Sequence, residues 1–111
     1  MSVEEKVTTE VLSGVKNVFG EKLKKVILYG SYARGDYDEG SDIDIMVLAD
    51  IERENIREYR PKIRRISNDV GLKNDILVSL MLKNEKYFFV NMPVSNFYRN
   101  VMKDGKLLYS S

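Results

Sequence analysis

The sequence predicts one α/β domain in which a small mixed β-sheet packs against helices. Three observations indicate this fold class. The length of 111 residues suits a single hydrophobic core. Short apolar, β-prone segments alternate with segments of helical periodicity, and their order along the chain is αβαβαβα. We therefore expect residues 1–111 to form a single domain.

The first half of the chain begins with a predicted amphipathic helix. Ser2 and Glu5 have the spacing of a capping box, and Gly20 ends the helix. Between these ends, apolar residues recur at helical steps: Val3, Val7, Val11, Val15 and Val18. Residues 26–29 and 43–48 are apolar and β-prone, so they predict two buried strands joined by a polar, glycine-rich connection.

The second half of the chain predicts three further helices and two strands. Asp50 is the candidate cap of a long helix that ends at Gly71, and Pro61 inside it predicts two helical pieces. The apolar positions of this helix alternate steps of three and four: Ile56, Tyr59, Ile63, Ile66 and Val70. The remaining elements are a third strand over 76–80, helices over 83–90 and 93–104, and a terminal strand over 106–109.

The composition limits the chemistry that is open to the chain. Its 18 basic and 17 acidic residues give a net charge of +1, which provides no long-range attraction for nucleic acid. Cysteine and histidine are absent, so any catalysis depends on carboxylates, hydroxyls and metal ions. No segment has the length and apolar character of a membrane span, and the N-terminus lacks the features of a secretion signal. We therefore expect a cytoplasmic protein.

The residues best suited to catalysis begin where the first predicted strand ends. Gly30 has no side chain, so a ligand phosphate can approach the main chain there. Ser31 adds a hydroxyl, and the amides that follow form an anion site if they open a short helix. Arg34 is a candidate phosphate contact, although an arginine before a glycine equally often anchors a loop by an ion pair. Together these residues are typical of the triphosphate end of a nucleotide site.

Two aspartates at the second predicted strand form a candidate metal site. Ten residues separate Ser31 from Asp42, and Asp44 follows two positions later. In a strand this spacing puts both carboxylates on one face, roughly 6.5 Å apart. Their mutual repulsion is relieved by a divalent cation, and hard oxygen ligands beside a triphosphate favour Mg²⁺.

The position of these residues constrains the sheet. Gly30 meets Asp42 only if the first two strands are antiparallel, and Asp75 reaches the same edge only if the second and third strands are parallel. Asp75, placed at the start of the third strand, is then the third carboxylate. Because histidine is absent, Asp75 is also the candidate for helping to deprotonate an acceptor hydroxyl, directly or through the metal.

Gly30 and Ser31, the ten-residue gap and the Asp42-x-Asp44 pair resemble the signature of the minimal nucleotidyltransferases of the DNA polymerase β superfamily. Residues 33–35 and 104–109 also match the family's pattern, so the resemblance spans nearly the whole chain.

This resemblance implies a nucleotidyltransferase fold and the transfer of a nucleoside monophosphate, AMP from ATP, to a hydroxyl group. It implies that Asp42, Asp44 and Asp75 are metal ligands and catalytic residues, and that Gly30 and Ser31 hold the triphosphate. The implied cofactors are Mg²⁺ and ATP as the nucleotide donor.

The resemblance also implies a partner. Family members of this size are often the antitoxin of a HEPN-domain toxin, and some attach AMP to a tyrosine of that toxin. Because 111 residues leave no room for a second domain that holds the acceptor, we expect a HEPN-type protein partner or a homodimer. The alternative is a binding module that neutralises its partner sterically. Transfer to an antibiotic or an RNA end is disfavoured by the size and the neutral charge.

Other conspicuous residues have plainer explanations. A basic run is expected to be the wet face of a helix, with Glu54 and Glu58 close enough to pair with it: Arg57, Arg60, Lys62, Arg64 and Arg65. Clustered aromatic residues are more often core or subunit interface than a base-stacking surface: Tyr87, Phe88, Phe89, Phe97 and Tyr98. Three acids are expected to be solvated loop residues: Asp36, Asp38 and Glu39.

Overall fold

A four-stranded mixed sheet organises the computed structural model, which describes all residues 1–111. The strands are β1 (Leu23–Tyr29), β2 (Ile43–Ala49), β3 (Val78–Asn84) and β4 (Lys106–Ser110), in the order β3-β2-β1-β4. β1 is antiparallel to both β2 and β4, whereas β2 and β3 are parallel. These pairings confirm the mixed sheet that the positions of the acidic residues require.

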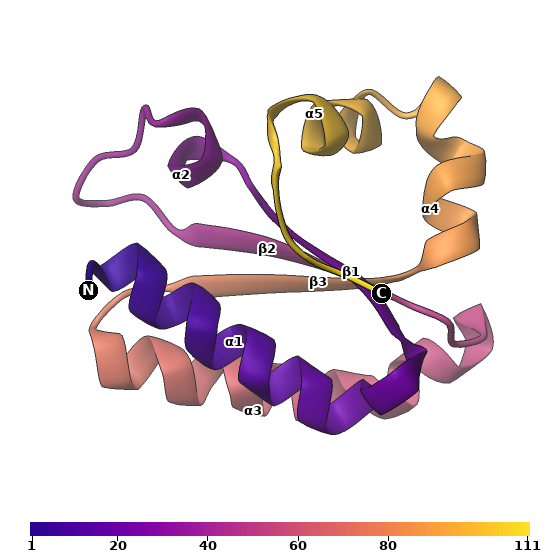
Figure 1. Cartoon of the computed structure of the whole chain (residues 1–111), viewed down its shortest axis with the longest axis horizontal. Helices are drawn as coiled ribbons and strands as arrows, with labels where there is room; N and C mark the ends of the chain where they lie inside the picture. Colours follow the sequence, from indigo (N-terminus) through magenta and orange to yellow (C-terminus); the bar gives the residue numbers. More distant parts are fainter.

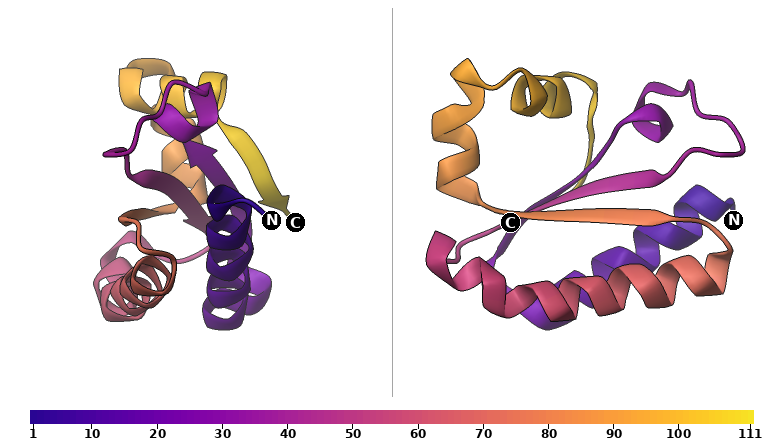
Figure 2. Two further views of the ribbon diagram at one scale, coloured as in Figure 1. Left: turned by 90° about the vertical axis from the view of Figure 1, so that its left-hand side faces the viewer. Right: turned by 180° about the vertical axis from the view of Figure 1, so that it is seen from behind.

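Helices cover both faces of this sheet (Figure 1). One face carries α1 (Val3–Phe19) and α3 (Ile56–Asn74), and the other carries α4 (Glu85–Asn91) and α5 (Asn96–Asp104). The side view in Figure 2 shows these two helical layers and the short α2 (Ser31–Arg34) beside the end of β1. Three 3₁₀ turns complete the chain: Gly20–Lys22, Arg53–Asn55 and Met92–Val94.

Two hydrophobic cores follow from the alternation of side chains along the strands. In β2, Ile43, Ile45 and Val47 point into the larger core beneath α1 and α3. Met46 and Leu48 point into the smaller core with Phe88 and other residues of α4 and α5. Because side chains alternate between faces, Asp44 lies on the same face as Met46 and Leu48. The Asp44 side chain therefore lies on the sheet face that α4 and α5 cover.

The helix start at Ser2 that the Ser2–Glu5 spacing predicts is confirmed. The Ser2 hydroxyl accepts a hydrogen bond from the Glu5 amide, and α1 buries Val7, Val11 and Val15 completely. Burial of each valine side chain stabilises the fold by about 1.5–3 kcal/mol. None of the helices is long and apolar enough to cross a membrane.

The prediction of two helical pieces around Pro61 is wrong. α3 is one continuous helix through that position and ends at Asn74, three residues after Gly71. Apolar residues on both sides of the proline pack against the larger core: Ile56 and Tyr59 before it, and Ile63 and Val70 after it. These tertiary contacts outweigh the local cost of the proline.

The boundaries after α3 also differ from those expected. β3 begins at Val78 because α3 and the turn after it occupy the chain as far as residue 77. Pro93 lies in a 3₁₀ turn rather than at the start of α5. The last helix begins at Asn96, where the Ser95 hydroxyl accepts a hydrogen bond from the Tyr98 amide.

Candidate active site

The end of β1 is shaped around a glycine without a side chain. Gly30 has φ 75°, a conformation that disfavours residues with a β-carbon, and α2 begins immediately after it. The neighbouring Tyr29 is paired with Asp44 across the β1–β2 ladder. A β-carbon at Gly30 would overlap Oδ2 of Asp44. The glycine therefore provides the space in which the Asp44 carboxylate lies.

The structure brings Asp42 close enough to act electrostatically on Asp44. Asp44 is half-buried on β2, and Asp42 is exposed just before the strand begins. Burial raises the pKa of Asp44 above its usual value of 3.8, the negative charge of Asp42 raises it further, and Arg34 opposes the shift. The two carboxylates thus form a site where negative charge accumulates and a cation is favourable.

Ser31 and Arg34 lie at the two ends of α2, adjacent to Gly30. The carbonyl of Ser31 accepts hydrogen bonds from the amides of Gly35 and Asp36, while its hydroxyl makes none. Nε of Arg34 forms an ion pair of 3.2 Å with the Asp36 carboxylate on the exposed surface. Arg34 therefore anchors the loop while its charge also acts on Asp44.

The loop between α2 and β2 is held by its own acidic residues. The Asp38 carboxylate accepts hydrogen bonds from the Gly40 amide and from the Ser41 hydroxyl. The rings of Tyr32 and Tyr37 stack with centroids 4.0 Å apart. This folding of the loop leads the chain back to the start of β2.

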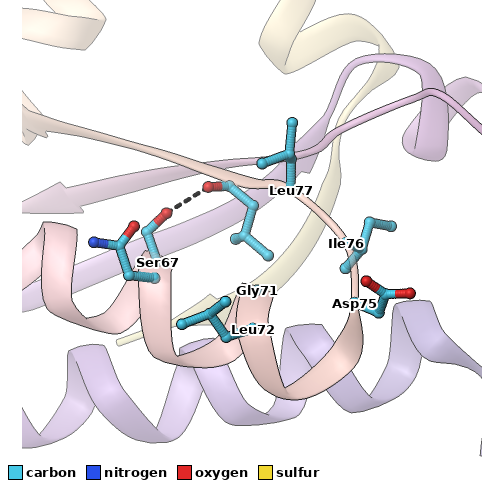
Figure 3. A pocket seen from close by; sticks show the side chains of 8 residues that line it. Ser67, Gly71, Leu72, Asp75, Ile76 and Leu77 are labelled. Atoms are coloured by element: carbon cyan, nitrogen blue, oxygen red, sulfur yellow. Dashed lines mark hydrogen bonds between the residues drawn. The ribbon is translucent and has the colours of Figure 1, made fainter.

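Asp75 does not lie where the sequence placed it. It is the residue that caps the C-terminus of α3, with φ 53°, and it precedes the start of β3 by three positions. Figure 3 shows its side chain at the turn between α3 and β3, where it lines a hollow of about 470 Å³ with Ser67 and Leu72. No group of three acidic side chains in the structure could hold a metal ion. On β3, the residue opposite Asp44 is Ser79.

A second hollow beside Gly30 was not expected from the sequence. It has a volume of about 210 Å³, and Tyr29 and Arg34 line it together with Phe97 and Asn100 of α5. Tyr29 and Phe97 meet edge to face with ring centroids 5.6 Å apart. Burial is the larger cause and the negative charge of Asp44 the smaller cause that together raise the pKa of Tyr29 to about 12. Asn100 and Asp104 of α5 also line this hollow, and their spacing of four residues puts them on one face of the helix. That spacing is the only feature of the sequence that could have indicated that α5 takes part in the hollow.

Comparison with known proteins identifies relatives of the whole chain. The sequence model of a family described as "Nucleotidyltransferase domain" matches residues 10–108. A protein of Methanocaldococcus jannaschii that carries the provisional name of protein adenylyltransferase is 35% identical over 107 residues, which cover 96% of this chain and 98% of the relative. A second protein of that organism with the same provisional name is 44% identical over 70 residues, covering 63% of this chain and 69% of the relative.

Solved structures share the fold. A chain in a crystal structure of a toxin–antitoxin with AMP-PNP superposes with a TM-score of 0.63 at 23% identity, covering 94% of this chain and 73% of that one. A chain from a tri-AMPylated Shewanella oneidensis HEPN toxin in complex with an MNT antitoxin gives a TM-score of 0.60 at 20% identity, covering 97% and 73%. A protein from Sulfolobus solfataricus with the provisional name of nucleotidyltransferase superposes with a TM-score of 0.62 at 20% identity, covering 99% of this chain and 89% of that one.

Proposed function

The chain belongs to the nucleotidyltransferase domain family, and we propose that it transfers AMP from ATP to a hydroxyl group of a partner protein. The observation that carries this proposal is the packing of the Asp44 carboxylate into the space left by Gly30, beside Asp42. This arrangement holds a pair of acids that attracts a cation beside the strand end at which α2 begins.

The two aspartates suit a divalent metal. Asp42 raises the pKa of Asp44, so a cation between the carboxylates relieves a repulsion that the fold itself creates. Carboxylate oxygens are the ligands that Mg²⁺ takes from proteins when phosphate oxygens and water complete its shell. We therefore propose Asp42 and Asp44 as the metal ligands. Mg²⁺, when bound, supplies positive charge that neutralises the triphosphate oxygens.

The residues around Gly30 orient the nucleotide. The Ser31 hydroxyl has no partner within the chain and is free to donate a hydrogen bond to a phosphate oxygen. Arg34 brings a positive charge to the same end of β1. In the reaction, the acceptor oxygen bonds to the α-phosphorus, and the bond from this phosphorus to the oxygen of pyrophosphate breaks. The hydroxyl proton passes to solvent, so adenylated acceptor, pyrophosphate and a proton are formed.

The acceptor that we propose is a tyrosine hydroxyl of a HEPN-type toxin. The provisional name of the Methanocaldococcus jannaschii relative and the AMPylated toxin in the Shewanella oneidensis complex both support a protein acceptor. The site is also open to a protein, because Asp42 and Arg34 are exposed at the molecular surface.

A labelling experiment tests this function. The purified protein is incubated with its candidate toxin, Mg²⁺ and ATP labelled at the α-phosphate, and label is expected on the toxin. Asp42→Asn with Asp44→Asn should abolish the label. The matched control, Asp50→Asn with Asp69→Asn, changes two exposed aspartates outside the site and should retain it. Undiminished labelling by the site variant would sink the proposal.

A steric binding module is the second candidate function. The observation in its favour is the position of Asp75, which caps α3, while Ser79 and not an acid lies opposite Asp44 on β3. A binding module would neutralise the toxin equally well after Asp42→Asn with Asp44→Asn, without any transfer of label. Loss of neutralisation by this variant, with the complex intact on size-exclusion chromatography, would instead support catalysis.

A further inference from the structure

One edge of the sheet presents unpaired main-chain groups. β3 is at the edge of the sheet, and only β2 pairs with it. The Ile43 amide donates a hydrogen bond to the Leu77 carbonyl. The main-chain N–H and C=O groups of the odd-numbered residues of this segment are therefore directed toward β2. The alternation of a strand then directs the N–H and C=O groups of Val78, Leu80 and Leu82 outward. The Ser67 hydroxyl donates a hydrogen bond to the Val78 carbonyl (Figure 3). The outward main-chain groups of Leu80 and Leu82 have no such partner.

A groove runs between this edge and α3, which we call the α3–β3 groove. It consists of two adjoining hollows of about 520 Å³ and 270 Å³, both lined by Arg60, Leu82 and Lys83. Farther along the same helix and strand, Leu72 and Leu77 are 84% and 73% exposed. These two leucines line the separate hollow that also contains Asp75, so an exposed apolar surface lies beyond the start of β3 and the charged groove lies toward its end.

Uncompensated positive charge lines the groove. Glu54 is its only acidic residue, whereas five cations line it: Arg53, Arg57, Arg60, Arg64 and Lys83. The expected pairing of the basic run with Glu54 and Glu58 is wrong, because none of the ion pairs in the structure involves these residues. Arg53 stacks on the ring of Tyr87, with its guanidinium carbon 3.8 Å from the ring centroid. The other four cations of the groove have no acidic partner in the chain and can bind an anionic ligand.

We propose that the α3–β3 groove binds an extended acidic segment of a partner protein, which adds to the edge of β3 as a further strand. The outward groups of Leu80 and Leu82 would pair with the peptide backbone, which is the main-chain recognition used when strands are added to a sheet. Acidic side chains on the groove side of the segment would meet the arginines of α3. Apolar side chains of the segment would cover Leu72 and Leu77.

Other occupants fit the groove less well. A second copy of the chain that paired through its own β3 would bring Arg60, Arg64 and Lys83 against the same cations, and like charges opposite one another are destabilising. A nucleic acid would use the cations but would leave the strand edge unpaired, since it offers no peptide groups. Only an acidic polypeptide satisfies both the charges and the main-chain groups.

The groove is separate from the candidate active site. Asp44 shares the sheet face of Met46 and Leu48, whereas Leu80 and Leu82 of the groove pack into the larger core on the opposite face. Lys83 of the groove is opposite Leu48, about 13 Å along the strand from the position opposite Asp44. Binding of a peptide in the groove thus requires neither a nucleotide nor Asp42 and Asp44, so the proposal stands or falls independently of nucleotidyl transfer.

Peptide binding to the full chain, measured by fluorescence anisotropy without nucleotide, tests the proposal. The probe is a fluorescein-labelled peptide of about ten alternating glutamates and valines, a length that spans β3. We expect saturable binding that weakens as salt is added. Arg60→Glu with Arg64→Glu should weaken binding about ten-fold or more. The matched control, Lys62→Glu with Arg65→Glu, makes the same charge change on α3 outside the groove and should stay within about two-fold.

Two further probes separate the contributions. A peptide of the same sequence that is N-methylated at alternate residues keeps its charges but cannot pair with a strand edge, and it should not bind. Equal binding of the methylated peptide would overturn the strand-addition proposal. The proposal also fails if a single-stranded RNA of similar length binds more tightly, if the peptide binds the control and groove variants equally, or if no peptide binds.

Discussion

The carboxylate of Asp44 lies in the space that a side chain at Gly30 would occupy. A β-carbon on Gly30 would overlap Oδ2 of Asp44, and the positive φ of Gly30 disfavours any residue that has a β-carbon. The register of β1 and β2 fixes this relationship, because it sets Tyr29 opposite Asp44. One glycine thus meets a backbone requirement of the strand end and a space requirement of the acidic site.

Gly30→Ala should therefore damage both activity and stability. The added methyl group displaces the Asp44 carboxylate, and a displacement of about 1 Å at a reacting centre commonly costs on the order of 100-fold in rate. The strained φ should lower the free energy of unfolding by about 1–3 kcal/mol. The effect on activity is measured as the rate of AMP transfer, and the effect on the free energy of unfolding is measured by urea denaturation.

Gly35→Ala is the matched control for that substitution. Gly35 also has a positive φ, of 85°, but a β-carbon there would meet nothing within 4 Å. We expect a similar loss of stability with transfer activity largely retained. A comparable loss of activity in both variants would show that strain, and not the displaced carboxylate, is responsible.

Asp44→Asn should stabilise the protein at neutral pH. The pKa of Asp44 is raised in the folded state, chiefly by burial and then by Asp42, so the fold favours its protonated form. Its contribution to stability is therefore present below the unfolded pKa and is lost as the pH rises through the folded pKa. The neutral amide avoids this loss, so the Tm should rise at pH 7, and the gain should vanish as the pH falls below about 3.8.

Thermal unfolding monitored by circular dichroism checks this pH dependence. Asp69→Asn removes an exposed aspartate of α3 and should leave the Tm unchanged at either pH. A lower Tm for Asp44→Asn at pH 7 would contradict the prediction, because it would mean that the charged carboxylate stabilises the fold.

The sequence predicted how Gly30, Asp42 and Asp44 are placed relative to one another but not the position of Asp75. The first three could be placed because a strand end, a glycine and a spacing of two residues are properties of short segments. The sequence misplaces Asp75 because Gly71 predicts a helix end three residues too early. The helix continues to Asn74, and an aspartate adopts the left-handed conformation that ends it. The apolar pattern could not distinguish a helix end from the turn that follows it.

The parts of the fold that follow from long apolar patterns could be predicted from the sequence. The parts that depend on contacts between distant segments could not. The valines of α1 and the alternation in β2 fixed the elements and the faces that they bury. The hollow lined by Tyr29 and Phe97, and the groove that the arginines of α3 form with β3, depend on residues that are far apart in sequence. No periodicity reports such contacts.

Asp75→Gly should stabilise the protein without impairing transfer. Asp75 has φ 53° at the end of α3, and glycine adopts this conformation without the penalty of a β-carbon. We expect the free energy of unfolding to rise by about 0.5–1 kcal/mol in urea denaturation. The rate of AMP transfer should stay within about two-fold of the original, whereas a loss of about 100-fold would restore Asp75 as a catalytic carboxylate.

Pro61→Ala should also raise stability, because the proline lies inside a continuous helix. Pro61 has no N–H to donate to the carbonyl four residues before it, and its ring crowds that carbonyl, a cost of about 3 kcal/mol in a helix interior. The greater freedom of alanine in the unfolded chain offsets about 0.4–1 kcal/mol of this gain. Urea denaturation should therefore show a net increase of about 2 kcal/mol, while Lys62→Ala, beside it on the exposed surface, should change stability by less than about 0.5 kcal/mol. No gain from Pro61→Ala would mean that α3 already accommodates the proline without losing a hydrogen bond that alanine can restore.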